Sequence, residues 1–384
     1  CTGTTTDLTG YAIYPTGPIS SYTVCEVPQA GWTQSYPKPV STSGGAVVTT
    51  VSGVNCWSGS IGTASGTGLD FGNYVQLSGL KFYDADTSGT QNNGEAGIQS
   101  FKINITYCAT GATCTSATPG ALSTQVTTGP NGTFTWNAPG SITSFLVCEV
   151  LPTTGGWVQT TTGNSGNCWS GTVGSGTQTA LTFGNICQGA GGALSKGFWS
   201  NKNGQSVLSA NDQAWRHVLN GDLSCPGPFC AVNGPAPYLR NLDGSYYSVS
   251  TSASFSTVAA SFGTWLTSGT SASNMAGQLS AQTAAMALNV DMVGGASFGL
   301  GPVGSGALVY AGPAPAACSV PGLTNGFISI TNLLNYSVNQ LRNDGLTTAA
   351  GTDRTCQTWA ELALDSGNNN KNFVQAKACP VIYP

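Results

Sequence analysis

The sequence predicts a multidomain protein that combines β and α structure, with two β-sandwiches followed by a mainly α-helical domain. Two observations carry this prediction: an internal repeat in the first half of the chain, and a change to helical periodicity after Cys187. Charged residues make up only 7% of the chain while 40% of its residues are hydrophobic, which predicts folded cores under a neutral, hydroxyl-rich surface. We expect domains at residues 1–75, 76–188 and 189–384.

The internal repeat matches residues 19–32 (ISSYTVCEVPQAGW) with residues 142–157 (ITSFLVCEVLPTTGGW). Two shorter matches follow in the same order: NCWSG at 55–59 and 167–171, and FGN at 71–73 and 183–185. A repeat of this length, with strand and turn spacing inside it, predicts tandem β-sandwich modules. The second module is complete at 76–188, whereas the first lacks the counterpart of the opening strands. A sandwich that lacks strands exposes apolar residues and unpaired backbone edges, so we expect another segment to cover this gap.

The opening of the second module contains an acidic loop between two predicted strands. Oxygen-bearing side chains occupy the first, third, fifth, seventh and twelfth positions of a twelve-residue spacing, with Gly89 at the sixth: Asp84, Asp86, Ser88, Thr90 and Glu95. This spacing is typical of a Ca²⁺ loop, in which alternate oxygens and a final carboxylate surround the ion. The spacing alone leaves open the alternative of a solvated turn that binds no metal.

The thirteen cysteines predict disulfide bonds and an extracellular or cell-surface location. A zinc site is excluded because the chain has one histidine and no CxxC pair. The repeat predicts the first two of the following bonds, a short hairpin tip predicts the third, and the last two remain if Cys379 pairs with Cys187: Cys25–Cys56, Cys148–Cys168, Cys108–Cys114, Cys225–Cys230 and Cys318–Cys356. An odd count leaves at least one sulfur for an intermolecular bond or a free thiol.

The charge distribution argues against two classes of partner. Eleven basic and fifteen acidic residues give a net charge of −4, and no basic run is present. Nucleic acids and anionic membranes are therefore not expected as partners. No apolar stretch approaches the length of a transmembrane helix, so membrane insertion is not expected either.

The segment GLKFYDADTSGTQNNGEAGI, followed by the VCEV…GW turn and the FGN strand, resembles the SdrD B-like and Cna B-type repeats of bacterial surface proteins. The resemblance implies an immunoglobulin-like or prealbumin-like sandwich used as a stalk, with Ca²⁺ in the matching loop. The Cna B-type relatives also imply an isopeptide bond between Lys81 and Asn185, assisted by Glu149. SdrD-type repeats generally lack this bond, so an ordinary edge lysine stays open as the alternative.

Helical periodicity dominates the remainder of the chain, with helices predicted at 207–219, 254–266, 272–290, 327–342 and 353–367. The motif GFWSNKNG resembles one in secreted bacterial proteins that place such a domain after SdrD-like repeats, and it supplies no activity. The single histidine, His217, lies on a predicted amphipathic helix, and the carboxylates show no paired spacing. We therefore predict that the chain is not an enzyme.

The C-terminal run 373–379 opens with Phe and ends in Cys, as the strand 101–108 does. We predict that this tail adds a strand to the incomplete first module of the next copy, with a disulfide between Cys379 and Cys1. Head-to-tail repetition then gives a homopolymer, the structural subunit of a secreted bacterial filament or matrix. Two alternatives stay open: Cys379 pairs with Cys187 in its own domain, or the chain is a monomeric adhesin stalk whose helical domain binds a ligand.

Overall fold

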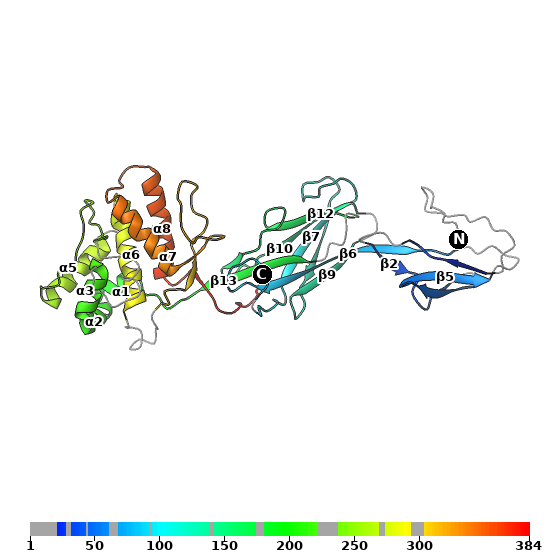
Figure 1. Ribbon diagram of the computed structural model, residues 1–384, viewed down its shortest axis with the longest axis horizontal. Coiled ribbons are helices and arrows are strands. Elements are labelled where there is room, and N and C mark those ends of the chain that lie inside the picture. Colours follow the sequence, from blue (N-terminus) through cyan, green and yellow to red (C-terminus); the bar gives the residue numbers. More distant parts are fainter. Residues whose placement is uncertain are drawn as a thin grey trace. The chain divides into compact units, whose positions relative to one another are not determined.

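The computed structural model describes residues 21–27, 32–43, 45–60, 68–92, 94–138, 142–173, 180–221, 237–268, 273–292 and 303–384. Three antiparallel sheets in the N-terminal half are followed by a mainly helical C-terminal region (Figure 1). The predicted fold class is confirmed. Among the described residues, no helix combines the length and the apolar character needed to cross a membrane.

The chain forms two compact units. The first contains residues 1–80, 102–150 and 163–182, and the second contains 81–101, 151–162 and 183–384. This division passes through the predicted second module, because its acidic loop and its last strand share contacts with the C-terminal region. The long strands β6 (Gly72–Tyr83) and β13 (Leu181–Gly189) each begin in the first unit and end in the second.

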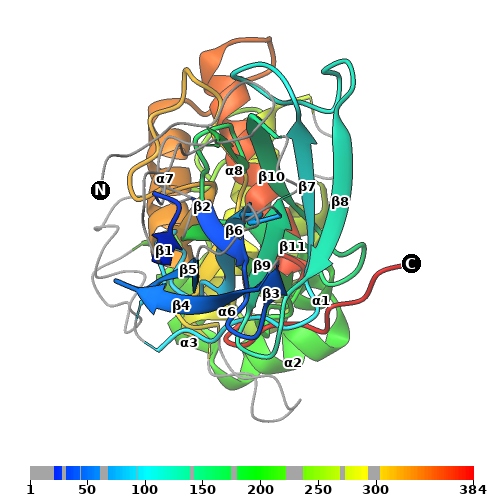
Figure 2. The same cartoon turned by 90° about the vertical axis from the view of Figure 1, so that its right-hand side faces the viewer.

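Two sheets lie wholly within the first unit. One has the order β1-β5-β4-β3, with β1 at Ser21–Val24, β5 at Val54–Ser60, β4 at Ala46–Val51 and β3 at Thr42–Ser43. The other has the order β12-β10-β7-β8, with β12 at Cys168–Thr172, β10 at Ser144–Val150, β7 at Lys102–Cys108 and β8 at Leu122–Thr127. Figure 2 shows β7 and β8 side by side. The strand β6 pairs with β2 (Trp32–Tyr36) and with β9 (Thr133–Ala138).

The sequence repeat is reproduced in the strand register. Val24 of β1 lies opposite Trp57 of β5, and Val147 of β10 lies opposite Trp169 of β12. Each tryptophan donates its indole N–H to a backbone oxygen thirteen residues later, at 2.9 Å in both cases. The two modules therefore use the same residues for the same pairings.

The second unit combines short strands with the helices. Among the described residues its strands, besides the ends of β6 and β13, are β11 (Trp157–Gln159), β14 (Leu308–Tyr310), β15 (Phe327–Ser329) and β16 (Phe373–Val374). Its helices are α1 (Lys196–Ser200), α2 (Lys202–Ala210), α3 (Asp212–Asn220), α5 (Phe255–Ser268), α6 (Met275–Asp291), α7 (Ile330–Asn343) and α8 (Thr352–Asn368).

The helix α6 is the centre of the helical core and contacts α1, α3, α5, α7 and α8 (Figure 1). Its small residues Ala281, Ala284 and Ala285 are buried, which lets the neighbouring helices approach closely. Two helix predictions need correction. The segment 207–219 is divided between α2 and α3 because Asn211 leaves the helical conformation, with φ −124° and ψ 33°. The segment 327–342 starts as β15, which pairs with β14 before Ser329 caps α7.

Candidate functional site

The acidic loop follows directly after β6 in the second unit. One carboxylate oxygen from each of Asp84, Asp86 and Glu95 lies within 4.8 Å of the others. The Asp84 side chain is fully buried, Glu95 is half-buried and Asp86 is exposed. Three converging carboxylates can hold a metal ion, so the structure brings together the three charged members of the predicted loop.

The backbone of the loop is organised around Asp84. Its two carboxylate oxygens accept hydrogen bonds from the backbone N–H groups of Ser88, at 2.9 Å, and Gly89, at 2.8 Å. Asp86 also accepts from the Ser88 N–H, at 3.0 Å. Gly89 stands at the predicted bend with φ +76°, in the left-handed region that favours glycine. The predicted glycine position is confirmed.

The uncharged members of the predicted loop contact each other. The Ser88 hydroxyl donates to the backbone oxygen of Thr90 at 3.0 Å. It also accepts from the Asn92 side-chain amide at 2.9 Å. Asn92 is a ninth-position residue that the prediction missed. Its Oδ1 atom is buried and has no hydrogen-bond partner among the described residues, so it is available as a further oxygen ligand. The twelve-residue spacing, in which the ninth position often contributes, could have identified it.

The loop environment changes the acidity of its carboxyls. Desolvation by burial raises the pKa of Asp84 above its ordinary value, although the hydrogen bond from the Gly89 N–H acts against this rise. Burial likewise raises the pKa of Glu95. Burial also acts to raise the pKa of Asp86, but hydrogen bonds, led by those from Ser88, bring it below its usual value. A bound cation would favour the ionised form of all three groups.

A second candidate site lies where β6 meets the last strand of the module. The side chains of Lys81, on β6, and Asn185, on β13, are both fully buried. Lys81 Nζ donates to Asn185 Oδ1 at 2.5 Å and to the backbone oxygen of Phe183 at 3.0 Å. The same amine lies 4.6 Å from the centre of the Phe101 ring. The predicted lysine and asparagine are therefore in direct contact in a dry environment.

This contact suits attack of the amine on the amide. Removal from water favours the neutral form of a lysine amine, which is the nucleophilic form. Attack on the Asn185 carboxamide carbon would form an amide bond between the side chains and release ammonia. The third predicted residue, Glu149, is half-buried on β10, opposite Ile103 of β7, and belongs to the first unit.

The C-terminal tail is engaged within its own unit. Cys379 forms a disulfide with Cys187, and β16 pairs with Gln188 and Gly189 of β13. The Tyr83 hydroxyl donates to the backbone oxygen of Gln375. The prediction that Cys379 bonds Cys1 of a neighbour is therefore corrected: this sulfur is already bonded, and the tail has backbone partners on its own chain.

The other disulfides that fall within the described residues are confirmed: Cys25–Cys56, Cys108–Cys114, Cys148–Cys168 and Cys318–Cys356. Cys1, Cys225 and Cys230 lie outside the described residues, and with them the predicted Cys225–Cys230 bond. Five disulfides indicate an oxidising environment.

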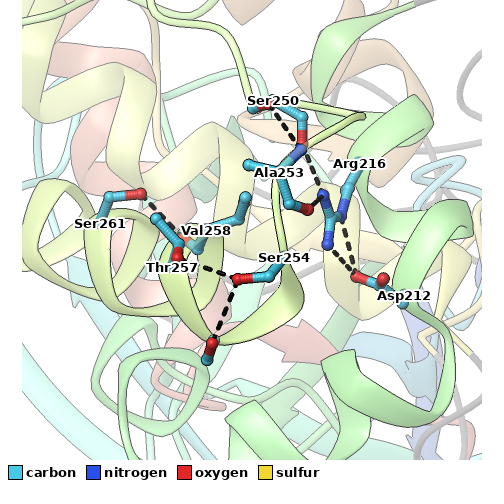
Figure 3. A network of polar contacts seen from close by, with 9 residues as sticks. Asp212, Arg216, Ser250, Ala253, Ser254, Thr257, Val258 and Ser261 are labelled. Carbon is cyan, nitrogen blue, oxygen red and sulfur yellow. Dashed lines mark hydrogen bonds and ion pairs between the residues drawn. The ribbon is translucent and has the colours of Figure 1, made fainter.

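A buried arginine in the helical region serves packing. Arg216 of α3 is buried and bonds Asp212 and the backbone oxygens of Ser250 and Ala253 (Figure 3). These bonds fix the segment that leads into α5. The neighbouring His217 is half-buried on the same helix. Within the described ranges, the acidic loop is the only place where three or more His, Cys, Asp or Glu ligand atoms gather.

No model of a known protein family matches the chain, and no curated protein matches it.

Proposed function

We propose that this chain is a structural subunit of a secreted bacterial filament or matrix, and that copies assemble by adding a strand to the incomplete first module. The single observation that carries the proposal is the edge of β1. Its counterpart β10 has β12 on one side and β7 on the other, with seven residue pairs along β7. Among the described residues, β1 pairs only with β5 and ends its sheet. A strand edge of this kind is a template for a strand from another chain.

Apolar exposure on β1 supports the same assembly. Val24 is 39% exposed, whereas its counterpart Val147 is fully buried. Val27, just beyond β1, is 86% exposed. Val24, whose counterpart forms core in the complete module, is thus partly uncovered in the first one. Covering them removes apolar surface from water, which favours association.

The two sites of the complete module fit a load-bearing subunit. The acidic loop, with Asp84, Asp86 and Glu95 as carboxylate ligands and oxygens of Ser88, Thr90 and Asn92 nearby, offers the hard oxygen donors that Ca²⁺ prefers. A bound Ca²⁺ would hold the loop in one conformation. A covalent bond between Lys81 and Asn185 would tie β6 to β13, and the Cys187–Cys379 disulfide ties the tail to β13. The bound ion, the covalent bond and the disulfide would each resist the separation of strands under load.

A charge on the exposed edge tests the assembly. We expect Val24→Asp to abolish filaments, because the assembled form buries this position whereas the free subunit leaves it partly in water. Negative-stain electron microscopy and sedimentation velocity of the full chain measure the effect.

The matched control is Val47→Asp on β4, since Val47 is 53% exposed and β4 already has β3 and β5 on its two sides. We expect this variant to assemble as the unaltered chain does. Dispersed monomers from the unaltered chain, or filaments from Val24→Asp, would contradict the proposal.

A further inference from the structure

A tight turn in the helical region carries exposed apolar side chains. An antiparallel bridge between Arg240 and Tyr246 closes this turn. Leu242 is 41% exposed and Tyr246 is 49% exposed, and Leu346, in the loop after α7, is 57% exposed. They are three of the five large hydrophobic side chains that are exposed among the described residues of 189–384. We call Leu242, Tyr246 and Leu346 the turn patch.

The loop that contains Leu346 packs against the turn. The Asn274 Nδ2 atom donates to the backbone oxygen of Leu242 at 3.2 Å and to that of Gly345 at 2.8 Å. Gly244, at the tip of the turn, has φ +88°, and a Cβ atom there would lie 3.1 Å from the Cβ of Leu346. The turn and the loop therefore form one continuous surface.

A buried arginine holds the shape of this surface. The Arg240 guanidinium donates to the backbone oxygens of Leu341, Arg342 and Gly244, at 2.8, 3.2 and 3.1 Å. Its central carbon lies 3.7 Å from the centre of the Tyr246 ring. One face of the ring is thus covered by Arg240, and the half-exposed ring presents its other face to water. A surface that is already rigid loses little conformational entropy when it binds a ligand.

Exposed polar side chains alternate with the apolar ones along the turn. Asp243 follows Leu242, and Ser245 precedes Tyr246. The Asp243 carboxylate accepts hydrogen bonds from the backbone N–H of Ser245, at 2.9 Å, and from its hydroxyl, at 2.6 Å. An apolar patch with a polar rim is typical of an interaction site. Here the rim offers a fixed carboxylate beside a flat aromatic ring.

We infer that the turn patch binds a polysaccharide of flat, equatorially substituted hexoses, as in β-1,4-linked chains of glucose or N-acetylglucosamine. Such a hexose has C–H groups on its faces and hydroxyls around its edge. Its face can stack on the open side of Tyr246 while an edge hydroxyl donates to Asp243. The site belongs to the helical region, so the inference is independent of the proposed assembly.

The size of the turn patch favours a sugar over a protein partner. Three half-exposed side chains of this size offer on the order of 300 Å², whereas a stable protein interface takes about 800 Å² from each partner. A few hexoses in a row cover the smaller area.

The test is isothermal titration calorimetry of the full chain with cellohexaose and with chitohexaose. We expect the chain to bind at least one of them, and to bind maltohexaose, a curved α-linked chain, more weakly. Tyr246→Ala should weaken binding about tenfold, whereas Tyr246→Phe keeps the ring and should bind as the unaltered chain does. Leu346→Ser should also weaken binding. Its matched control is Leu362→Ser on α8, which alters a leucine that is 60% exposed and should leave binding unchanged.

Several results would overturn the inference. They are a lack of binding to both β-linked sugars, equal binding of maltohexaose, and equal effects of Leu346→Ser and Leu362→Ser. Self-association in sedimentation velocity that Leu346→Ser abolishes, without sugar binding, would make the turn patch an interface with a second copy instead. The two exposed leucines decide the question even where Tyr246→Ala lowers the stability of the fold. Sugar binding by a chain that forms no filaments would contradict only the assembly.

Discussion

Replacing Asn185 by Ala is expected to destabilise the protein, by about 1–3 kcal/mol, because the fully buried Lys81 amine then loses the Asn185 side-chain oxygen as a hydrogen-bond acceptor. Any covalent bond between the two strands is lost as well. Lys81→Met is the matched comparison, since it keeps an unbranched side chain only one atom shorter and removes the amine that needs hydrogen-bond acceptors. We expect Lys81→Met to lower the free energy of unfolding clearly less than Asn185→Ala does. Denaturant unfolding of the two variants and of the unaltered chain measures these free energies.

The same proteins report whether the bond forms. The unaltered chain is expected to be lighter than its sequence mass by one ammonia beyond the losses due to disulfides, and the missing ammonia should map to Lys81 and Asn185. Neither variant should show this loss. An unaltered chain of full mass would contradict the cross-link. Equal destabilisation by the two variants would contradict the role given to the buried amine.

Much of the β region could be predicted because the repeat supplied its own comparison. The recurrence of VCEV and NCWSG predicted two disulfides, and the structure places them in equivalent registers. The position of Gly89 likewise followed from a spacing rule and agrees with its positive φ. The contact between Lys81 and Asn185, 104 residues apart, was expected only from a resemblance.

The failures arose where long-range partners decide the structure. The tail residues 373–379 share a pattern with β7. Only two of them form a strand, β16, and so short a strand does not indicate which sheet edge it pairs with. The bond from Cys379 to Cys187 and the pairing with β13 settle its place. The helix predicted at 207–219 ignored Asn211, whose side chain bonds the backbone oxygen of Val207 and helps end α2. Asn92 was missed because an amide in a polar loop resembles an ordinary turn residue.

Saturation with Ca²⁺ is expected to stabilise the protein, by about 2.7 kcal/mol when free Ca²⁺ is one hundred times the dissociation constant. Asp84→Asn should abolish this gain, because Asp84 is the buried carboxylate at the first position of the loop. Asp243→Asn, at an exposed turn of the same unit, is the matched control and should respond to Ca²⁺ as the unaltered chain does. Thermal unfolding with Ca²⁺ and with a chelator measures the difference.

Acidification should weaken Ca²⁺ binding at a higher pH than ordinary carboxylates would require. Burial raises the pKa values of Asp84 and Glu95, so protons compete with the ion as soon as the pH falls toward these raised values.

In the metal-free protein, these two carboxyls make the stability of the fold depend on pH in the opposite direction. A carboxyl with a raised pKa in the folded state contributes stability at low pH, and this contribution is lost as the pH rises through the raised value. Asp86, whose pKa is lowered, acts in the opposite sense. The stabilisation by Ca²⁺ should therefore grow with pH above the ordinary carboxyl range, and a gain that is constant there, or equal in Asp84→Asn, would show that the loop is not the binding site.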